Sequence, residues 1–327
     1  MDVLVVGANG QLGAACCRRL LAEGHRVRGS VRSLDRAAGL DGVDLKVADL
    51  AGDLDVDALL SGIEAMIITA NTAVPRVGDD LSGFLRGEHR LIDAAGQLGV
   101  RRIVLPSVPA THVDAHVPIA AERRRLEEQV RAAVPGSVIL RFPPFIEVWL
   151  ALVGSSLPLR GEQHATIGRP SPFLRRFRAA TGSTVEKRGL MLVPGPVTHQ
   201  QAFITVADAA AACVNALGRD DLAGETVDVG GPQVLTWVDV ARVFSDVLGR
   251  RVRAVSTPAA VFAVMASLLR PVAPVASRTL ALNRFVGASE TAWTPPGGGL
   301  VDPSAMTTVE QFLRTKAALP ATLPKVA

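Results

Sequence analysis

Tyrosine is absent from this sequence of 327 residues, and lysine is scarce. Without a phenol group, acid–base chemistry in the protein depends on other side chains or on water. The chain has four lysines, so most of its positive charge comes from arginine. The arginine runs at residues 123–125 and 175–178 are short and accompany no DNA-binding motif. We therefore expect solvated helix faces there and no nucleic-acid partner.

Cysteine is also scarce, with three positions at Cys16, Cys17 and Cys213. No Cys-x-x-Cys pair and no histidine at ligand spacing accompanies them, which predicts neither a disulfide framework nor a metal site. The uncharged stretch at residues 254–269 is too short to span a bilayer. Because the chain opens directly on a strand pattern, we expect no signal peptide and a cytoplasmic location.

Glycine is present in an informative pattern near the start of the chain. Gly7, Gly10 and Gly13 lie between an apolar run at residues 3–6 and a helical pattern at residues 12–23. A strand, a glycine turn and a helix are typical of a dinucleotide-binding site, because glycine permits the tight turn and close approach of the pyrophosphate to the helix N-terminus. The residues expected at the cofactor are Gly7, Asn9, Gly10, Gln11, Leu12 and Gly13.

Strand and helix patterns alternate after this turn. Strands are predicted at residues 26–31, 43–47, 65–70 and 102–105, and helices at residues 57–62 and 81–98. This rhythm predicts an α/β fold of the Rossmann type, a doubly wound parallel sheet that binds ligands at the carboxyl ends of its strands. One crevice is then expected to be bordered by Gly7, Arg32, Asp49, Ala70 and Ser107.

The end of the second predicted strand bears on the choice of cofactor. An acidic residue there holds the ribose 2′-OH of NAD, whereas an arginine suits the 2′-phosphate of NADP. Arg32 stands at this position, with Arg28 and Ser33 nearby, which favours NADP(H). Asp35 also lies close by and points the other way.

Several longer stretches carry a known pattern. They include Val-Gly-Ala-Asn-Gly-Gln-Leu-Gly at residues 6–13, Gly-Val-Arg-Arg-Ile-Val-Leu-Pro-Ser at residues 99–107 and Val-Ile-Leu-Arg-Phe-Pro-Pro-Phe at residues 138–145. Together with residues 24–32, 48–50, 91–95, 203–210 and 224–232, they resemble the extended or atypical branch of the short-chain dehydrogenase/reductase superfamily, often called NmrA-like. The resemblance covers about the first 250 residues.

The resemblance implies roles for particular residues. Asp49 and Leu50 would contact the adenine. Ala70, with Asn71 beside it, would lie at the ribose or the phosphates. The segment from Pro143 to Phe145 would lie at the nicotinamide end of the cofactor.

The sequence departs from this family where the proton donor is expected. The usual enzyme has a serine after the fifth strand and, on the next helix, a tyrosine four residues before a lysine. Ser107 fits the serine, but Ile119 aligns with the tyrosine and Arg123 with the lysine. Arginine keeps the positive charge that holds the nicotinamide ribose, but it does not exchange protons near neutral pH, and isoleucine donates nothing.

Three functions are compatible with isoleucine and arginine at the positions of the family's tyrosine and lysine. The first is a reductase whose proton comes from His112, His116 or Thr111, from the substrate's own hydroxyl or from water; both histidines also fit exposed loop positions. The second is a protein that binds NADP(H) without catalysis and acts as a redox-responsive regulator. The third is a net non-redox isomerase or epimerase. We favour an NADP(H)-dependent reductase of a small, largely apolar carbonyl or enone compound, with Ser107 holding the substrate oxygen.

The domain organisation follows from the same patterns. Residues 1–150 are expected to form the NAD(P)-binding domain, with a late strand at residues 225–230 rejoining its sheet. Residues 151–327 are expected to form a smaller, mostly helical region that covers the substrate, with a loop-rich segment at residues 150–193. The apolar segment 257–269 fits core or lid packing, the roof of a substrate pocket, a dimer face or contact with a membrane surface. We expect a monomer or a homodimer.

Overall fold

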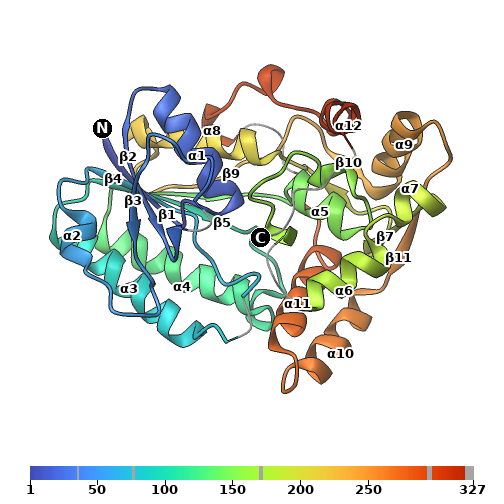
Figure 1. Cartoon of the computed structure of the whole chain (residues 1–327), viewed down its shortest axis with the longest axis horizontal. Helices are drawn as coiled ribbons and strands as arrows, with labels where there is room; N and C mark the ends of the chain where they lie inside the picture. The colour runs from blue at the N-terminus through green and yellow to red at the C-terminus, as the bar shows by residue number, and fades with distance from the viewer. Residues whose placement is uncertain (35–36, 76–77, 169–171, 293–296, 321–327) are drawn as a thin grey trace.

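The chain forms two joined subdomains, one built on a central sheet and one mainly helical (Figure 1). This computed structural model describes residues 1–34, 37–75, 78–168, 172–292 and 297–320. Asp35, which bears on the choice of cofactor, lies outside these ranges.

The central sheet has seven parallel strands in the order β3-β2-β1-β4-β5-β6-β9. The strands are β1 (Asp2–Val6), β2 (Arg26–Val31), β3 (Asp44–Val47), β4 (Ala65–Ile68), β5 (Arg102–Ser107), β6 (Val138–Arg141) and β9 (Thr226–Asp228). β1 and β4 are buried along almost their whole length, which explains why their sequences are apolar without alternation. The predicted doubly wound parallel sheet is confirmed, and β9 completes it beside β6.

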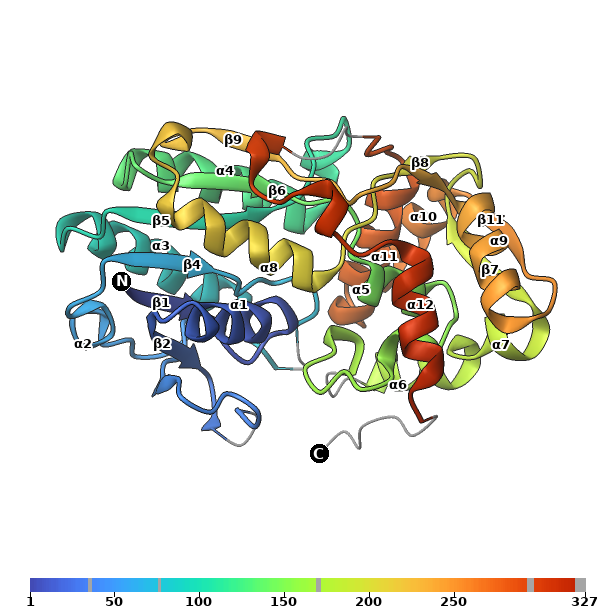
Figure 2. The same cartoon turned by 90° about the horizontal axis from the view of Figure 1, so that it is seen from above.

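Helices cover both faces of this sheet (Figure 2). One face carries α1 (Gln11–Ala22) and α8 (Val206–Asn215), and the other carries α2 (Val56–Leu60), α3 (Leu81–Gln97) and α4 (Pro118–Ala133). Successive side chains of a strand point to opposite faces. Val3 and Val5 of β1 accordingly pack in the first layer, and Leu4 and Val6 pack in the second.

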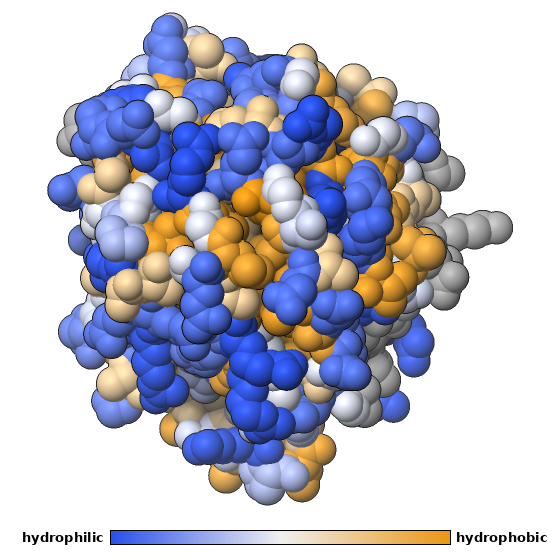
Figure 3. All heavy atoms as spheres, turned by 90° about the vertical axis from the view of Figure 1, so that its left-hand side faces the viewer, coloured by the Kyte–Doolittle hydropathy of each residue, from blue (hydrophilic) through white to orange (hydrophobic). Residues whose placement is uncertain are grey.

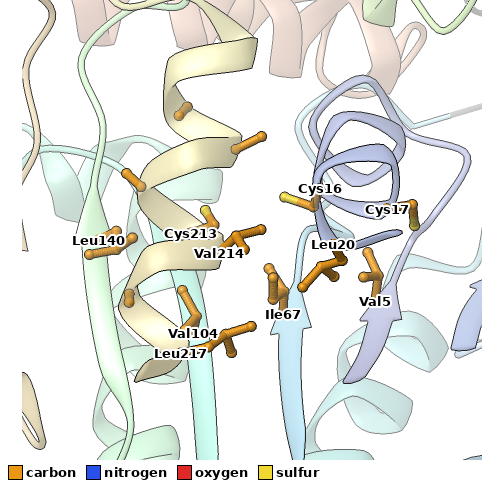
Figure 4. Packing of buried hydrophobic residues seen from close by; sticks show 14 of the residues in the cluster. Val5, Cys16, Cys17, Leu20, Ile67, Val104, Leu140, Cys213, Val214 and Leu217 are labelled. Carbon is orange, nitrogen blue, oxygen red and sulfur yellow. The ribbon is translucent and has the colours of Figure 1, made fainter. Parts of the chain in front are cut away.

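Figure 4 shows the layer between the sheet and the helices α1 and α8. Val5 meets Leu20 there, and the sulfur atom of Cys16 points from α1 toward α8, which carries Cys213. The hydrogen bond with Cys213, together with burial, raises the pKa of Cys16 well above its ordinary value. Cys16 therefore stays a protonated thiol of low reactivity. All three cysteines are buried and free.

The second subdomain has its own apolar core, centred on Phe203, Trp237 and Phe244. Its elements are α5 (Ile146–Leu152), α6 (Pro172–Thr181), α7 (Thr184–Arg188), α9 (Trp237–Leu248), α10 (Ala259–Leu269), α11 (Pro274–Gly287) and α12 (Val309–Ala318), with a parallel ribbon of β7 (Leu190–Pro194) and β11 (Arg253–Thr257) and an antiparallel pair of β8 (Gln200–Gln201) and β10 (Leu235–Thr236). Where the sequence predicts mainly loop, at residues 150–193, the structure also places α6, α7 and β7. Helix α7 and strand β7 have five residues each, which is too short for a measurable period.

The surface away from the second subdomain is mainly hydrophilic, with an apolar band across its middle (Figure 3). Separate apolar residues such as Val47 on β3 and Leu98 after α3 are exposed, which is ordinary for a protein surface. Within the described ranges, none of the helices combines the length and the apolarity needed to cross a bilayer.

A buried carboxylate joins α5 to α8. Glu147 is 5% exposed, and its two oxygens accept hydrogen bonds from the N–H of Val206 at 3.0 and 3.1 Å. Val206 is the first residue of α8, so Glu147 satisfies a donor at the start of that helix. Burial raises the pKa of Glu147 to about 7, although the hydrogen bond from Val206 opposes this shift.

The raised pKa of Glu147 predicts a loss of stability as the pH rises. The folded protein keeps the proton between about pH 4.5 and pH 7 while the unfolded chain loses it, so the free energy of unfolding falls across this window, by about 2–4 kcal/mol from this group. Glu147→Gln keeps an acceptor for Val206 without the charge. We expect the variant to lose less stability than the wild type between pH 5 and pH 8, measured by urea unfolding.

The exposed Glu310, on α12, provides the control. Glu310→Gln should leave the pH dependence of the free energy of unfolding unchanged. If Glu147→Gln and the wild type lose stability in parallel between pH 5 and pH 8, Glu147 is already ionised in the folded protein and the prediction is wrong.

Candidate functional site

A cleft of about 550 Å³ opens at the carboxyl ends of β1 to β4. Its other wall comes from the second subdomain, through residues 159–168 and Arg178. The predicted site residues that line it are Gly7, Asn9, Gly10, Arg32, Asp49, Leu50, Ala70 and Asn71. The structure thus brings together residues that are expected at the adenine, the pyrophosphate and the ribose.

The glycine turn between β1 and α1 forms the floor of the cleft. Gly7 has a φ of 83°, which side chains other than glycine rarely adopt, and a Cβ on it would lie 3.0 Å from the backbone nitrogen of Ala70. A Cβ on Gly13 would lie 2.2 Å from the carbonyl oxygen of Gly7. Gly13 therefore allows α1 to approach the strand closely, as a dinucleotide-binding turn requires.

Helix α1 begins in this cleft without a side-chain cap. Its N-cap residue is Gly10, which makes no side-chain hydrogen bond. By contrast, α2, α3, α8, α9 and α12 are capped by the side chains of Asp55, Asp80, Thr205, Thr236 and Thr308. The first N–H groups of α1 are thus left without intrahelical acceptors and suit the oxygens of a phosphate.

The second subdomain is fastened directly onto this turn. Gln11 Oε1 accepts a hydrogen bond from the N–H of Thr166 at 3.1 Å, and Gln11 Nε2 donates to Glu162 at 3.5 Å. Lys316, from α12, in turn donates to Glu162 at 2.5 Å. The sequence carries no signal for these contacts, because their partners are more than 150 residues apart and lie where the chain shows no period.

His164 adds a polar atom to the roof of the cleft. Its Nδ1 lies 3.2 Å from the carbonyl oxygen of Asn9, so the neutral ring donates there and carries a free lone pair on Nε2. Burial lowers the pKa of His164, against the effect of that carbonyl. Among the described residues, no hydrogen-bond partner reaches the buried Nε2. The lone pair on Nε2 is an acceptor and does not bond a phosphate oxygen, so a pyrophosphate would be held by the N–H groups at the start of α1, beneath His164.

Arg32 lies at the rim of the cleft, at the end of β2. Its Nη1 donates to Asp79 Oδ1 at 2.8 Å, and both side chains are partly exposed. Asp79 also lines the cleft. A guanidinium at this place suits a 2′-phosphate, which would compete with Asp79 for it. Ser33 follows Arg32 and lies outside the residues described as the lining of the cleft.

Ser107, predicted to hold the substrate oxygen, is 5% exposed at the end of β5. Its Oγ donates to Glu127 at 2.6 Å, and the same carboxylate pairs with Arg124 and with Arg141. Burial raises the pKa of Glu127, but the bonds from Arg141 and Ser107 and the charge of Arg124 outweigh burial, so the pKa is lowered overall. The hydroxyl proton of Ser107 is thus already engaged by a carboxylate.

Arg123 lies beneath the cleft rather than in its lining. It is 5% exposed, donates to the carbonyl oxygen of Ala70 at 2.5 Å, and stands 3.7 Å from the carboxylate of Glu88. Burial raises the pKa of Glu88 to about 7, although Arg123 opposes the shift. Ile119, at the position of the family's tyrosine, is buried in the apolar core of the second subdomain.

The remaining predicted residues lie outside the lining described for the cleft. His112 and His116 are exposed on the loop before α4. Pro143 is buried, and Phe145 packs its ring 5.8 Å from that of Phe142 at the start of α5. Gln11, Leu12 and Gly13 belong to the first turn of α1, directly behind the floor of the cleft.

Comparison with known proteins agrees with this geometry. Residues 1–290 match the model of a family described as NmrA-like. The ceramide reductase of Caulobacter vibrioides is 28% identical over 332 residues, which cover 96% of this chain and 92% of that protein. The photosystem II assembly factor Ycf39 of Cyanophora paradoxa is 28% identical over 166 residues, so the match spans 50% of this chain and 51% of that protein. Other curated relatives are matched over a third to two fifths of their own length.

A similar fold occurs in a solved structure. The NADPH-dependent quinone oxidoreductase QOR2 of Escherichia coli, in complex with NADPH, superposes with a TM-score of 0.67 at 21% identity. The superposition covers 96% of this chain and 99% of that one. At this identity the likeness shows the fold.

The position of Ser107 generates a prediction with two readouts. Ser107→Ala removes a donor from the buried Glu127, so we expect the free energy of unfolding to fall by about 1–3 kcal/mol, measured by urea unfolding. The exposed Ser61→Ala is the control and should leave stability unchanged. A Ser107→Ala protein of unchanged stability whose turnover is much reduced would instead show that the hydroxyl serves the substrate.

Proposed function

The chain belongs to the NmrA-like family, and we propose that it is an NADP(H)-dependent reductase of a small, largely apolar carbonyl or enone compound. The proposal is carried by the cleft itself. The uncapped start of α1 forms its floor, and the second subdomain closes over it through Gln11 and His164. A cleft that is roofed at the cofactor suits hydride transfer, because it holds cofactor and substrate against each other.

Known relatives support a reductase. A ceramide reductase matches nearly the full chain, and an NADPH-dependent quinone oxidoreductase shares the fold. A regulator that reads the redox state of its cofactor would need less cover over the cleft than the second subdomain supplies. A cytoplasmic location and a monomeric or homodimeric state remain predictions from the sequence.

The residues of the cleft divide the binding of the cofactor among them. The start of α1 holds the pyrophosphate beneath His164, Asp49 and Leu50 lie at the adenine, and Ala70 with Asn71 borders the ribose. Arg123 acts from beneath, by holding the carbonyl of Ala70 in place. When bound, the nicotinamide supplies the hydride.

The proton comes from solvent in this proposal. Ile119 carries no proton to donate, and the hydroxyl proton of Ser107 is held by Glu127. His112 and His116 are exposed, away from the residues described at the cleft. A direct role for Ser107 requires its Oγ to exchange Glu127 for the substrate oxygen. Without a positioned acid, the developing oxyanion is stabilised by hydrogen bonds alone and turnover is slow.

The preference for NADP(H) over NAD(H) rests on Arg32. In Arg32→Ala, we expect the affinity for NADPH to fall by about tenfold or more, because a charge-assisted hydrogen bond to the 2′-phosphate contributes about 1.5–3 kcal/mol. The affinity for NADH should hardly change. Calorimetric titration of both cofactors measures the two Kd values.

Asp79→Ala is the matched variant, because it frees the guanidinium from its carboxylate. This variant should bind NADPH at least as tightly as the wild type. Equal losses of NADPH and NADH affinity in Arg32→Ala would mean that Arg32 supports the shape of the cleft and does not read the 2′-phosphate.

A non-catalytic NADP(H) sensor is the second candidate, favoured by Ile119 in the place of the tyrosine. An assay separates the two functions: purified protein and NADPH are mixed with a panel of quinones, ketones and enones, and the NADPH absorbance is followed. The reductase predicts oxidation that depends on both the protein and one class of substrate. Tight cofactor binding with a strong preference between NADPH and NADP⁺, but no oxidation with any compound, would favour the sensor.

A further inference from the structure

Helix α10 presents an apolar stripe to solvent. Val261, Val264, Met265, Leu268 and Val272 follow one another at helical spacing and are 42%, 58%, 44%, 71% and 77% exposed. Residues three and four apart lie on one side of a helix, so these side chains form a continuous row from α10 into the turn that follows it. We call this row the α10 stripe.

The opposite side of α10 is already packed. Ala266 is buried, and its carbonyl oxygen accepts a hydrogen bond from Ser277 of α11 at 2.7 Å. The helix carries no charged residue between Ala259 and Leu269. A helix that is apolar all round is normally covered on every side or set against lipid. The α10 stripe therefore indicates a contact with something outside the described chain.

The charge around α10 selects the kind of partner. From residue 247 to residue 289 the chain has six arginines and neither aspartate nor glutamate. Arg251 and Arg253 are exposed before α10, and Arg270 is exposed at its end. Arginines on both sides of an exposed apolar row, in a segment without carboxylates, suit contact with an anionic lipid surface, which attracts the arginines and takes up the apolar side chains.

We propose that the α10 stripe docks on an anionic lipid surface. A second copy of this chain fits the face less well, because a symmetric contact would bring two arginine-rich, carboxylate-free segments together. The stripe also has five side chains, whereas stable protein interfaces use about 20–30 residues a side. A short apolar row can insert into the interfacial region of a bilayer without the large contact area that a protein interface needs.

The position of α10 relative to the cofactor cleft suggests what a lipid contact would do for the protein. Helix α11 lies between α10 and the cofactor cleft: its Arg278 donates to the carbonyl oxygen of Thr72 at 2.9 Å, and Thr72 lines the cleft. Docking through α10 therefore holds the substrate side of the protein near the lipid, where an apolar carbonyl compound would be dissolved. The docking itself does not depend on the proposed reductase activity.

Sedimentation with vesicles tests the contact on the full chain. The probes are vesicles of phosphatidylcholine, with and without phosphatidylglycerol as a third of the lipid. We expect binding to the anionic vesicles that weakens with added salt. The double variant Val264→Glu, Leu268→Glu should reduce the partition coefficient by about tenfold or more, because it places two carboxylates in the lipid contact.

The matched control is the double variant Val47→Glu, Leu98→Glu, which adds the same charge at exposed apolar positions of the sheet subdomain. It should bind vesicles as the wild type does, and thermal melts should show that both double variants fold. Absence of vesicle binding by the wild type, equal binding to both kinds of vesicle, or an equal loss in the control would overturn the proposal. The proposal would also be overturned if light scattering showed that the wild type is a dimer and that the double variant Val264→Glu, Leu268→Glu is a monomer.

Discussion

The N–H groups at the start of α1 are the feature on which the rest of the molecule depends. A helix N-terminus that has no side-chain cap is unfavourable in a closed interior unless an anion or water satisfies it. Helices α2, α3, α8, α9 and α12 use aspartate or threonine there, while α1 has Gly10 at the floor of the cleft. The second subdomain roofs this same point through its contacts with Asn9 and Gln11. The two subdomains therefore meet directly above the place where a phosphate would bind.

Helix α4 carries two buried charges that serve structural contacts. Arg123 and Glu127 are both buried. Arg123 contacts the carbonyl oxygen of Ala70 and the carboxylate of Glu88. Glu127 contacts Ser107, Arg124 and Arg141. Breaking one partner of a buried pair leaves an uncompensated charge, which makes such networks rigid. The helix that carries proton transfer in related enzymes therefore stabilises the ends of β4 and β5 here. The proposed mechanism accordingly takes its proton from water.

The second subdomain contributes to two different surfaces, the wall of the cofactor cleft and the exposed face of α10. On the inside, the segment at residues 159–168 closes the cleft over the glycine turn. On the outside, α10 leaves an apolar row uncovered in a stretch of chain free of carboxylates. Helix α11 connects the two sides through Arg278. This arrangement suits a protein that takes an apolar substrate from a lipid surface and reduces it in a covered cleft.

The sequence by itself determined the sheet, the glycine turn and the bottom of the cleft. These features arise from local patterns: an apolar β-branched run, glycines at a spacing of three, and strand ends that a parallel sheet places along one edge. It also contains no tyrosine and has Ile119 where the family resemblance expects one, which predicts a different proton donor. Tertiary structure alone decided what closes the cleft and what surrounds each polar group. Glu162 meets the first helix at Gln11 and His164 meets the glycine turn at Asn9, both across more than 150 residues, and the hydroxyl of Ser107 donates to Glu127. Such contacts depend on how two subdomains pack, which no local period in the chain records.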